Sequence, residues 1–325
     1  MRIGVLGAAR IAPAALIRPA RDVPGVEVAA IAARLRMRAT AFAGKNGIPI
    51  IHETYDDLLA DDTLDAVYIP LPNGRHARWT LAALSAGKHV LVEKPSTANA
   101  AQARAVAAAA TDSGLVVMEA FHYRYHPLAA RMAAIVHGGE LGRIRRVETS
   151  MCFPLPSFSD IRYDYGLAGG ALMDAGCYAV HCLRLLSPNT PRVTGARART
   201  LRSEPRIDRA MDARLDLGDG ATGLIRTSIW STTILSMRAR VLGDRGSLVV
   251  DNYILPHLFH RFTLTLAGRR VHEKFTGPSS YTHQLRAFAA AVNGSPANLT
   301  PPSDSVTTMS LIDDIYQAAG LPLRQ

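Results

Sequence analysis

Short apolar runs alternate with helix-forming segments over the first 120 residues, and this alternation limits the possible folds more than any other feature. Each run is short and nearly continuous, as in strands that are buried on both faces of a parallel sheet. The runs lie at residues 3–6, 26–32, 50–51, 66–69, 90–92 and 116–118. Because parallel strands need helical crossovers, residues 1–122 are predicted to form a doubly wound α/β domain.

After Gly142 the pattern changes to one in which apolar and polar residues alternate. Residues 211–217 and 237–241 both follow this period of two, and each is followed by a glycine-containing turn. This pattern is typical of antiparallel strands with one buried face. With an apolar helix at 171–186 and helices from 281 and 303, residues 123–325 are predicted to form an α+β domain with an open, mostly antiparallel sheet.

Composition sets the broad class of the protein. The chain has 325 residues, of which 48% are hydrophobic and 20% charged, and its net charge is +10. These values are typical of a globular protein, and the length allows two domains. The basic residues are spread along the chain, so the net charge is the only argument for a nucleic-acid partner. Binding of a polyanionic cofactor explains this charge equally well.

The three cysteines predict neither a disulfide framework nor a zinc site, and no metal site is expected. The N-terminus superficially resembles a secretory signal, but Gly4, Gly7 and Arg10 interrupt its apolar run. No apolar run is long enough to span a membrane. We therefore expect a cytoplasmic protein without a membrane partner.

The first strand leads into a variant of the dinucleotide-binding fingerprint of Rossmann domains. Gly7 can make the tight turn, and Ala12 allows a helix to pack closely on the strand. Ala9 stands where a glycine usually lets the backbone approach the pyrophosphate. The turn predicts cofactor contacts from Gly7, Ala9, Arg10 and Ile11.

The second strand ends at a position that distinguishes NAD from NADP. Proteins that prefer NAD place a carboxylate here for the ribose 2′-hydroxyl, whereas an arginine accommodates a 2′-phosphate. This chain has Arg34, followed by Arg38, and Glu27 lies at the wrong end of the strand. The sequence favours NADP(H), with NAD as a possible second cofactor; the alternative is a solvated basic start of a helix.

Two further strands deliver polar residues to the same sheet edge. Glu93, Lys94 and Pro95 follow a buried strand directly, and a lysine in this position is costly unless its ammonium has a role. The preceding strand ends in a rigid loop that can lie against the nicotinamide ribose. From these segments we predict cofactor contacts by Leu71, Pro72, Asn73, His76, Glu93 and Lys94.

The predicted apolar helix carries Asp174, Tyr178 and His181 on one face, because they are four and three residues apart. Such a face suits a catalytic site, and a buried tyrosine that is hydrogen-bonded to a helix neighbour is an equally good interpretation. His122, after the sixth strand, is a candidate to line a substrate pocket or else a surface histidine. Arg162 and His181 complete the predicted substrate contacts.

Taken together, four segments resemble the glucose–fructose oxidoreductase/inositol dehydrogenase (Gfo/Idh/MocA) family, in particular its branch with dimeric dihydrodiol dehydrogenase. They are the glycine turn, Glu93-Lys94-Pro95, the segment 118–124 and the segment 169–178. The resemblance implies an NAD(P)-dependent oxidoreductase that acts on CH–OH groups of sugars, cyclitols or related diols. It also implies a homodimer, or a dimer of dimers, formed through the C-terminal sheet.

Carried over to this chain, the resemblance implies that Lys94, Tyr178 and Asp174 are the catalytic residues. A tyrosine titrates near pH ~10, and a nearby ammonium stabilises the phenolate, so Lys94 is expected to activate Tyr178 as a proton carrier. Asp174 is expected to hold substrate hydroxyls or the lysine. The alternative is an NAD(P)-sensing regulator that has lost catalysis, but a sensor needs neither Lys94 nor Tyr178.

Overall fold

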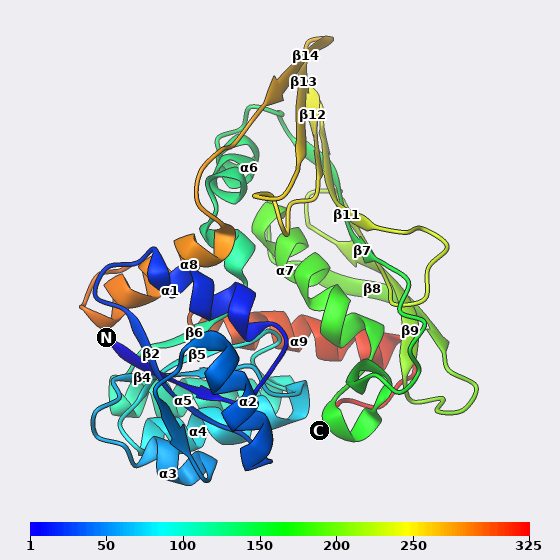
Figure 1. The fold of residues 1–325 in the computed structure, drawn as a ribbon. Helices are drawn as coiled ribbons and strands as arrows, with labels where there is room; N and C mark the ends of the chain where they lie inside the picture. Colours follow the sequence, from blue (N-terminus) through cyan, green and yellow to red (C-terminus); the bar gives the residue numbers. More distant parts are fainter. The chain divides into compact units, whose positions relative to one another are not determined.

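The protein, seen here in a computed structural model of residues 1–325, consists of two compact units (Figure 1). Met1–Tyr125 and Pro278–Val306 form the first unit, and His126–Gly277 and Thr307–Gln325 form the second. The segment Pro278–Val306, which the sequence-based division assigned to the C-terminal domain, thus packs with the N-terminal residues. The helix α9 (Pro302–Ala318) begins in the first unit and ends in the second.

The first unit contains a parallel six-stranded sheet with the order β3-β2-β1-β4-β5-β6. Its strands are β1 (Arg2–Leu6), β2 (Glu27–Ala32), β3 (Ile50–His52), β4 (Ala66–Ile69), β5 (His89–Val92) and β6 (Val117–Glu119). The chain reverses direction along the sheet between β1 and β4, where doubly wound folds bind ligands outside the carboxyl ends of the strands. The predicted Rossmann topology is confirmed.

Helices connect these strands. They are α1 (Arg18–Arg21), α2 (Arg36–Asn46), α3 (Tyr55–Leu59), α4 (His76–Ser85) and α5 (Ala100–Ser113), with a 3₁₀ turn at Asn73–Arg75. The first unit also contains a 3₁₀ turn after β6, His122–Tyr125, and the helix α8 (Ser280–Val292), which follows the second sheet in the chain. The helix after the glycine turn begins with a π-helical turn, Pro13–Ile17, rather than an α-helical one. The side chain of Thr54 caps α3 by accepting from the backbone N–H of Asp57, as its position before the helix predicts.

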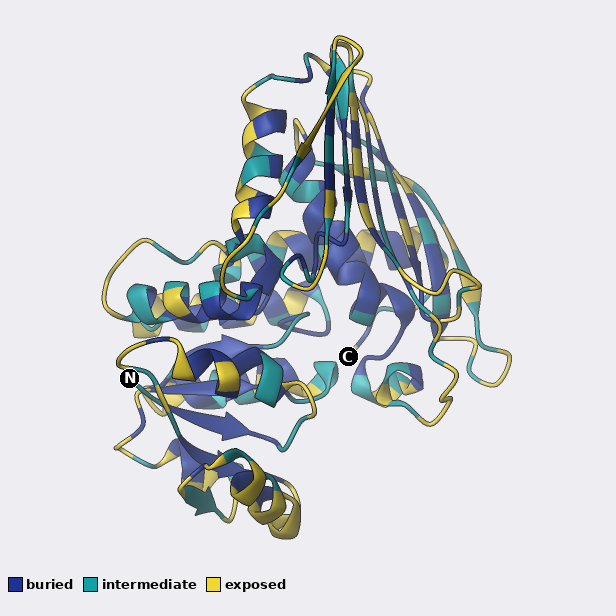
Figure 2. Cartoon of the chain, turned by 45° about the horizontal axis from the view of Figure 1, so that its top comes forward, coloured by how far each residue is buried: buried dark blue, intermediate teal, exposed yellow.

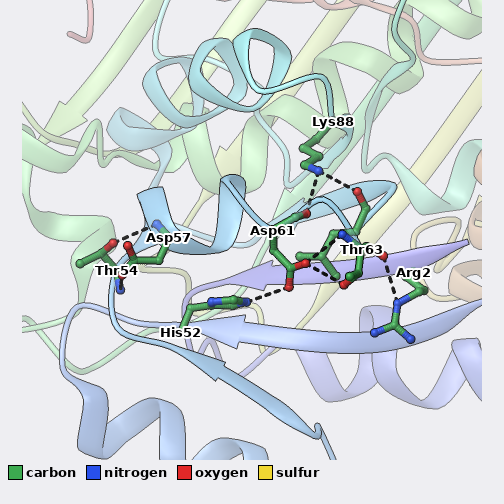
Figure 3. A network of polar contacts seen from close by, with 8 residues as sticks. Arg2, His52, Thr54, Asp57, Asp61, Thr63 and Lys88 are labelled. Carbon is green, nitrogen blue, oxygen red and sulfur yellow. Dashed lines mark hydrogen bonds and ion pairs between the residues drawn. The ribbon is translucent and has the colours of Figure 1, made fainter.

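A buried lysine connects β5 to the loop before β4. The Nζ atom of Lys88 donates to the carbonyl oxygens of Asp61, at 2.8 Å, and Leu64, at 2.9 Å (Figure 3). The carboxylate of Asp61 accepts from Thr63 and lies 3.0 Å from Nε2 of His52. Because a buried ammonium needs hydrogen-bond acceptors in place of water, the two Lys88 contacts hold the loop against the sheet.

The second unit is built on an eight-stranded sheet with the order β14-β13-β12-β11-β7-β10-β9-β8. Its strands are β7 (Ile144–Cys152), β8 (Arg192–Thr200), β9 (Asp208–Asp216), β10 (Thr222–Ser228), β11 (Ser236–Gly243), β12 (Gly246–Asp251), β13 (Arg261–Leu266) and β14 (Arg269–Glu273). All neighbours are antiparallel except β7 and β10. The predicted open, mostly antiparallel sheet is confirmed.

One face of this sheet is buried and the other carries charge, so burial alternates along its strands (Figure 2). Cross-strand ion pairs occupy the charged face. They are Arg192–Asp216, Arg226–Asp212, Arg238–Asp251, Arg261–Asp251 and Arg240–Glu148. Each pair joins neighbouring strands, where opposite charges stabilise pairing modestly.

The other helical segments of this unit are α6 (Pro127–His137), α7 (Cys177–Leu186), a π-helical turn Leu172–Gly176 and 3₁₀ turns at Ile161–Tyr163 and Tyr165–Leu167. The helix predicted at 171–186 thus starts with a π-helical turn before it becomes α-helical. Hydroxyls on the sheet hold it: Thr227 donates to the carbonyl oxygen of Ala171, and Thr149 to that of Ala179. None of the helices combines the length and hydropathy that a bilayer-spanning segment needs.

Candidate active site

The glycine turn after β1 has the geometry that a cofactor loop requires. Gly7 has φ +109°, and a Cβ added there would lie 2.9 Å from Cδ2 of Leu71. Its N–H donates to the carbonyl oxygen of Ala32 at 2.8 Å, and the N–H of Ala9 donates back to Gly7 at 2.9 Å. A side chain at position 7 would strain the backbone and push Leu71 away. The turn therefore lies directly against the loop that follows β4.

Arg34 and Arg38 are exposed near the carboxyl end of β2, and both affect the pKa of the Tyr55 hydroxyl. Burial raises the pKa of Tyr55, while the backbone N–H of Arg34 and the charges of Arg34 and Arg38 oppose that rise. The Tyr55 hydroxyl lies 3.8 Å from the place of a Cβ on Gly7. Two guanidiniums, a hydroxyl and the glycine turn thus gather at the ends of β1 and β2, a donor set that fits a phosphate group.

Sequence reasoning did not identify Tyr55. Its only local signal was its position directly after the helix cap Thr54, which says nothing about a ligand. The nearby Arg36 is different from Arg34 and Arg38, because it forms an ion pair with Glu53.

Lys94 follows β5 and is half-buried, and the Lys94–Pro95 peptide bond is cis. The ring of His76 lies between two carbonyl oxygens: Nδ1 is 2.7 Å from that of Pro95, and Nε2 is 2.6 Å from that of Leu71. Burial, helped by the charge of Lys94, lowers the pKa of His76 to about 4 against the pull of both carbonyls. The ring of His76 therefore joins the loop after β4 to the segment after β5, both of which were predicted to contact the cofactor.

Glu93 faces inward as well, because the hydroxyl of Tyr68 donates to its Oε1 at 2.7 Å. Tyr68 is completely buried on β4, and burial together with the Glu93 charge raises its pKa well above the usual value. Tyr68 thus remains a hydrogen-bond donor that orients the Glu93 carboxylate. Pro72 and Asn73 lie half-buried in the loop after β4.

His122 is enclosed by α8 in the first unit. It is 2% exposed, its Nδ1 lies 2.8 Å from the hydroxyl of Ser280, and its ring centroid is 3.9 Å from that of Tyr281. The sequence offered a pocket-lining or a surface histidine for this position, and the structure shows a buried, stacked ring. Its partners are 158 residues away in the chain, so no local pattern announces them.

In the second unit, Asp174 lies in the π-helical turn and is held by Arg162. The guanidinium Nε of Arg162 donates to Oδ2 of Asp174 at 2.5 Å, and its Nη1 lies 3.0 Å from Oδ1 of Asp160. The Arg162 side chain remains 32% exposed. Two residues predicted separately, one for catalysis and one for substrate, thus form one ion pair.

Tyr178 and His181 both lie on α7 and are buried, at 7% and 3% exposure. Lys94 belongs to the first unit and Tyr178 to the second. The structure therefore gives the surroundings of each residue within its own unit. The pairing of Lys94 with Tyr178 stays a prediction.

Comparisons with known protein families agree with both units. Residues 1–121 match the family model described as "Oxidoreductase family, NAD-binding Rossmann fold", and residues 129–249 match the "GFO/IDH/MocA C-terminal domain". A D-xylose 1-dehydrogenase (NADP(+)) from Haloferax volcanii is 40% identical, over 98% of this chain and 97% of that protein.

Other similar proteins are reductases. A dTDP-3,4-didehydro-2,6-dideoxy-α-D-glucose 3-reductase from Streptomyces violaceoruber is 37% identical over 90% of this chain and 85% of its own. The crystal structure of a 3-ketoreductase from Actinomadura kijaniata in complex with NADP and TDP-benzene superimposes with a TM-score of 0.89 at 30% identity, covering 98% and 97% of the two chains. Variants of that ketoreductase in which one lysine or one tyrosine is replaced have also been crystallised with both ligands.

Proposed function

Because the chain belongs to the Gfo/Idh/MocA family of oxidoreductases, we propose that it transfers a hydride between NADP(H) and the C1 carbon of a free aldose such as D-xylose. The observation that carries this choice of substrate is the 40% identity to an NADP-dependent D-xylose 1-dehydrogenase over nearly the full length of both chains. The 37% identity to a dTDP-sugar reductase makes a nucleotide-linked keto sugar the second candidate.

The residues at the ends of β1 and β2 fit NADP. Arg34 and Arg38 would bind the 2′-phosphate, the backbone at Gly7 and Ala9 would approach the pyrophosphate, and Leu71 would border the turn. Bound there, the nicotinamide accepts or supplies the hydride, and the protein orients the sugar and moves one proton.

The proton transfer is assigned to Tyr178. In sugar oxidation the C1 hydroxyl loses its proton to Tyr178 while the C1 hydride leaves to the nicotinamide, so the products are a lactone, a reduced cofactor and one proton. The ammonium of Lys94 would stabilise the phenolate and polarise the substrate oxygen. Asp174, aligned by Arg162, would accept hydrogen bonds from sugar hydroxyls.

The positions substituted in the related ketoreductase support this pair. The lysine and the tyrosine replaced there are 84 positions apart, as are Lys94 and Tyr178 here. Equal spacing in two chains that align over nearly their full lengths is expected when the same two positions correspond.

A direct experiment is to titrate the protein with NADPH and then follow absorbance with NADP⁺ and a panel of free aldoses, cyclitols and diols. In parallel, NADPH consumption is measured with a dTDP-linked 3-keto sugar. Turnover of D-xylose or another aldose supports the proposal. Turnover of the dTDP sugar alone would transfer the assignment to the second candidate, and NADPH binding without any turnover would favour the regulator.

We also propose that the charged face of the C-terminal sheet mediates a homodimer, as the sequence resemblance implies. Leu224, Leu242 and Val249 lie on this face among the arginines by strand register. Trp230 follows β10 and packs against Phe158, with ring centroids 5.2 Å apart. The predicted cytoplasmic location also remains a proposal.

A further inference from the structure

A buried ion pair lies next to the start of the helix that carries Asp174 and Tyr178. Asp208, at the first position of β9, and Arg324 are both 0% exposed, and Nη2 of Arg324 lies 2.7 Å from Oδ1 of Asp208. Two charges removed from water in this way are costly unless their remaining donors and acceptors are also satisfied. The other hydrogen bonds of Asp208 and Arg324 therefore indicate which part of the structure the ion pair holds in place.

Each member of the pair also binds one backbone segment, residues 169–172. Oδ2 of Asp208 accepts from the N–H of Leu172 at 2.7 Å, and Nε of Arg324 donates to the carbonyl oxygen of Gly169 at 2.7 Å. In addition, Tyr316 Oη donates to Asp208 Oδ1 at 3.0 Å, and Arg324 Nη1 donates to the Pro322 carbonyl at 3.0 Å. The pair thus binds the backbone on both sides of Gly170, where the helix begins.

Gly170 packs directly on this ion pair and is hydrogen-bonded through its backbone to Asp174. It has φ +131°, and a Cβ there would lie 2.9 Å from both Arg324 Nη2 and Tyr316 Oη and would collide with Asp208. Its carbonyl oxygen accepts from the N–H of Asp174 at 3.0 Å, and its own N–H donates to the carbonyl of Arg162 at 2.9 Å. Asp174 is therefore held through its backbone by Gly170 and through its carboxylate by Arg162.

We propose that Arg324 and Asp208 are positioning residues for the reaction, because they set where the helix bearing Asp174 and Tyr178 begins. This inference rests on the proposed function. An arginine with this task must reach two acceptors at once, the Asp208 carboxylate and the Gly169 carbonyl, which the forked guanidinium allows and an ammonium allows only in part. Small misplacements of catalytic groups can lower turnover by about 10²-fold.

The test compares Arg324→Met, Arg324→Lys and the control Arg206→Met. Arg206 is a matched control, because its guanidinium lies 4.2 Å from the centroid of Tyr165, the ring that Arg324 also approaches at 5.1 Å, but its ion pair is with Glu204. We measure kcat and KM for the aldose, Kd for NADPH, and Tm. For Arg324→Met we expect kcat to fall about 10²-fold with NADPH affinity within about twofold. Arg324→Lys should recover part of kcat, and Arg206→Met should match the wild type.

A folded Arg324→Met variant with wild-type kcat, whatever its Tm, would overturn the inference. If that variant does not fold, Tyr316→Phe removes a single hydroxyl of the cluster, which donates to Asp208 and accepts from the backbone N–H of Met173. A kcat lowered severalfold at unchanged NADPH affinity supports the inference, and an unchanged kcat overturns it. Should the wild type turn over no sugar, the proposed function fails separately. Amide hydrogen exchange of residues 169–178 then tests the positioning role without an activity assay. Faster exchange in Arg324→Met but not in Arg206→Met supports the inference that the ion pair holds the start of the helix, and equal exchange in both variants overturns it.

Discussion

Nδ1 of His76 lies 2.7 Å from the carbonyl oxygen of Pro95, the residue that follows Lys94. Through its other nitrogen the same ring approaches the carbonyl of Leu71 at 2.6 Å, so one side chain joins the loop after β4 to the lysine segment after β5. A neutral imidazole has a single N–H and can donate to only one of these oxygens, whereas an imidazolium could donate to both. The protonation state of His76 is therefore open to direct measurement.

We expect His76 to be neutral down to acidic pH, because burial lowers its pKa to about 4. The unfolded chain binds a proton near pH ~6.5, so stability is complete above that value and decreases as the pH falls towards 4, by up to about 3 kcal/mol. An NMR titration of His76, with unfolding measured across this range, checks the sign. A pKa above ~6.5, with stability increasing as the pH falls, would show the doubly hydrogen-bonded imidazolium instead.

Arg34→Ala should weaken NADPH binding much more than NADH binding, because only NADPH carries the 2′-phosphate. Loss of a charge-assisted hydrogen bond predicts a change of about 10-fold to 100-fold in the Kd of NADPH. Arg36→Ala is the matched control, because it removes the same charge from a residue that forms an ion pair with Glu53. Equal losses for both cofactors, or a wild-type preference for NADH, would contradict the NADP assignment.

Tyr178→Phe should lower kcat by about 10²–10⁴-fold while NADPH affinity is kept, because the variant loses only the hydroxyl that carries the proton. Lys94→Met should act similarly and remove the pH dependence that the pair sets together. In the double variant the second substitution should cost little, as for residues that act as a unit. Wild-type turnover by Tyr178→Phe on an established substrate would make Tyr178 a structural residue.

Arg162→Met should raise KM for the sugar and lower kcat, because Asp174 loses the partner that aligns its carboxylate. An Arg–carboxylate contact of this kind is geometrically specific, so Arg162→Lys should restore activity only in part. Steady-state kinetics with the aldose test this, with NADPH affinity as the internal control. Unchanged kinetics in both variants would mean that the pair only stabilises the loop.

Sedimentation velocity should show a dimer at micromolar concentration. Because the proposed interface is rich in arginine–carboxylate pairs, Arg240→Glu should weaken association by placing like charge beside Glu148. A wild-type protein that sediments only as a monomer would remove the dimer from the proposal.

Local patterns were sufficient wherever the physical cause is local. Continuous apolar runs predicted the parallel strands, because a strand covered on both faces has no polar side, and the period of two predicted the antiparallel strands for the opposite reason. The cap of α3 has a local cause as well, since Thr54 accepts from a backbone N–H within one helical turn. The family resemblance came from the order of several such segments.

Only the tertiary structure decided which distant residues meet. Asp208 and Arg324 are 116 residues apart, and neither position carries a pattern that marks it as buried or paired. In the sequence His122 is only a polar residue after a strand, whereas in the structure Ser280 and Tyr281 enclose it. Arg162 and Asp174 were each predicted to be functional, but their ion pair depends on how the loop before α7 folds back. Sequence periodicity reports which face of an element is apolar, whereas a specific contact depends on three-dimensional packing between elements that the chain connects in no regular way.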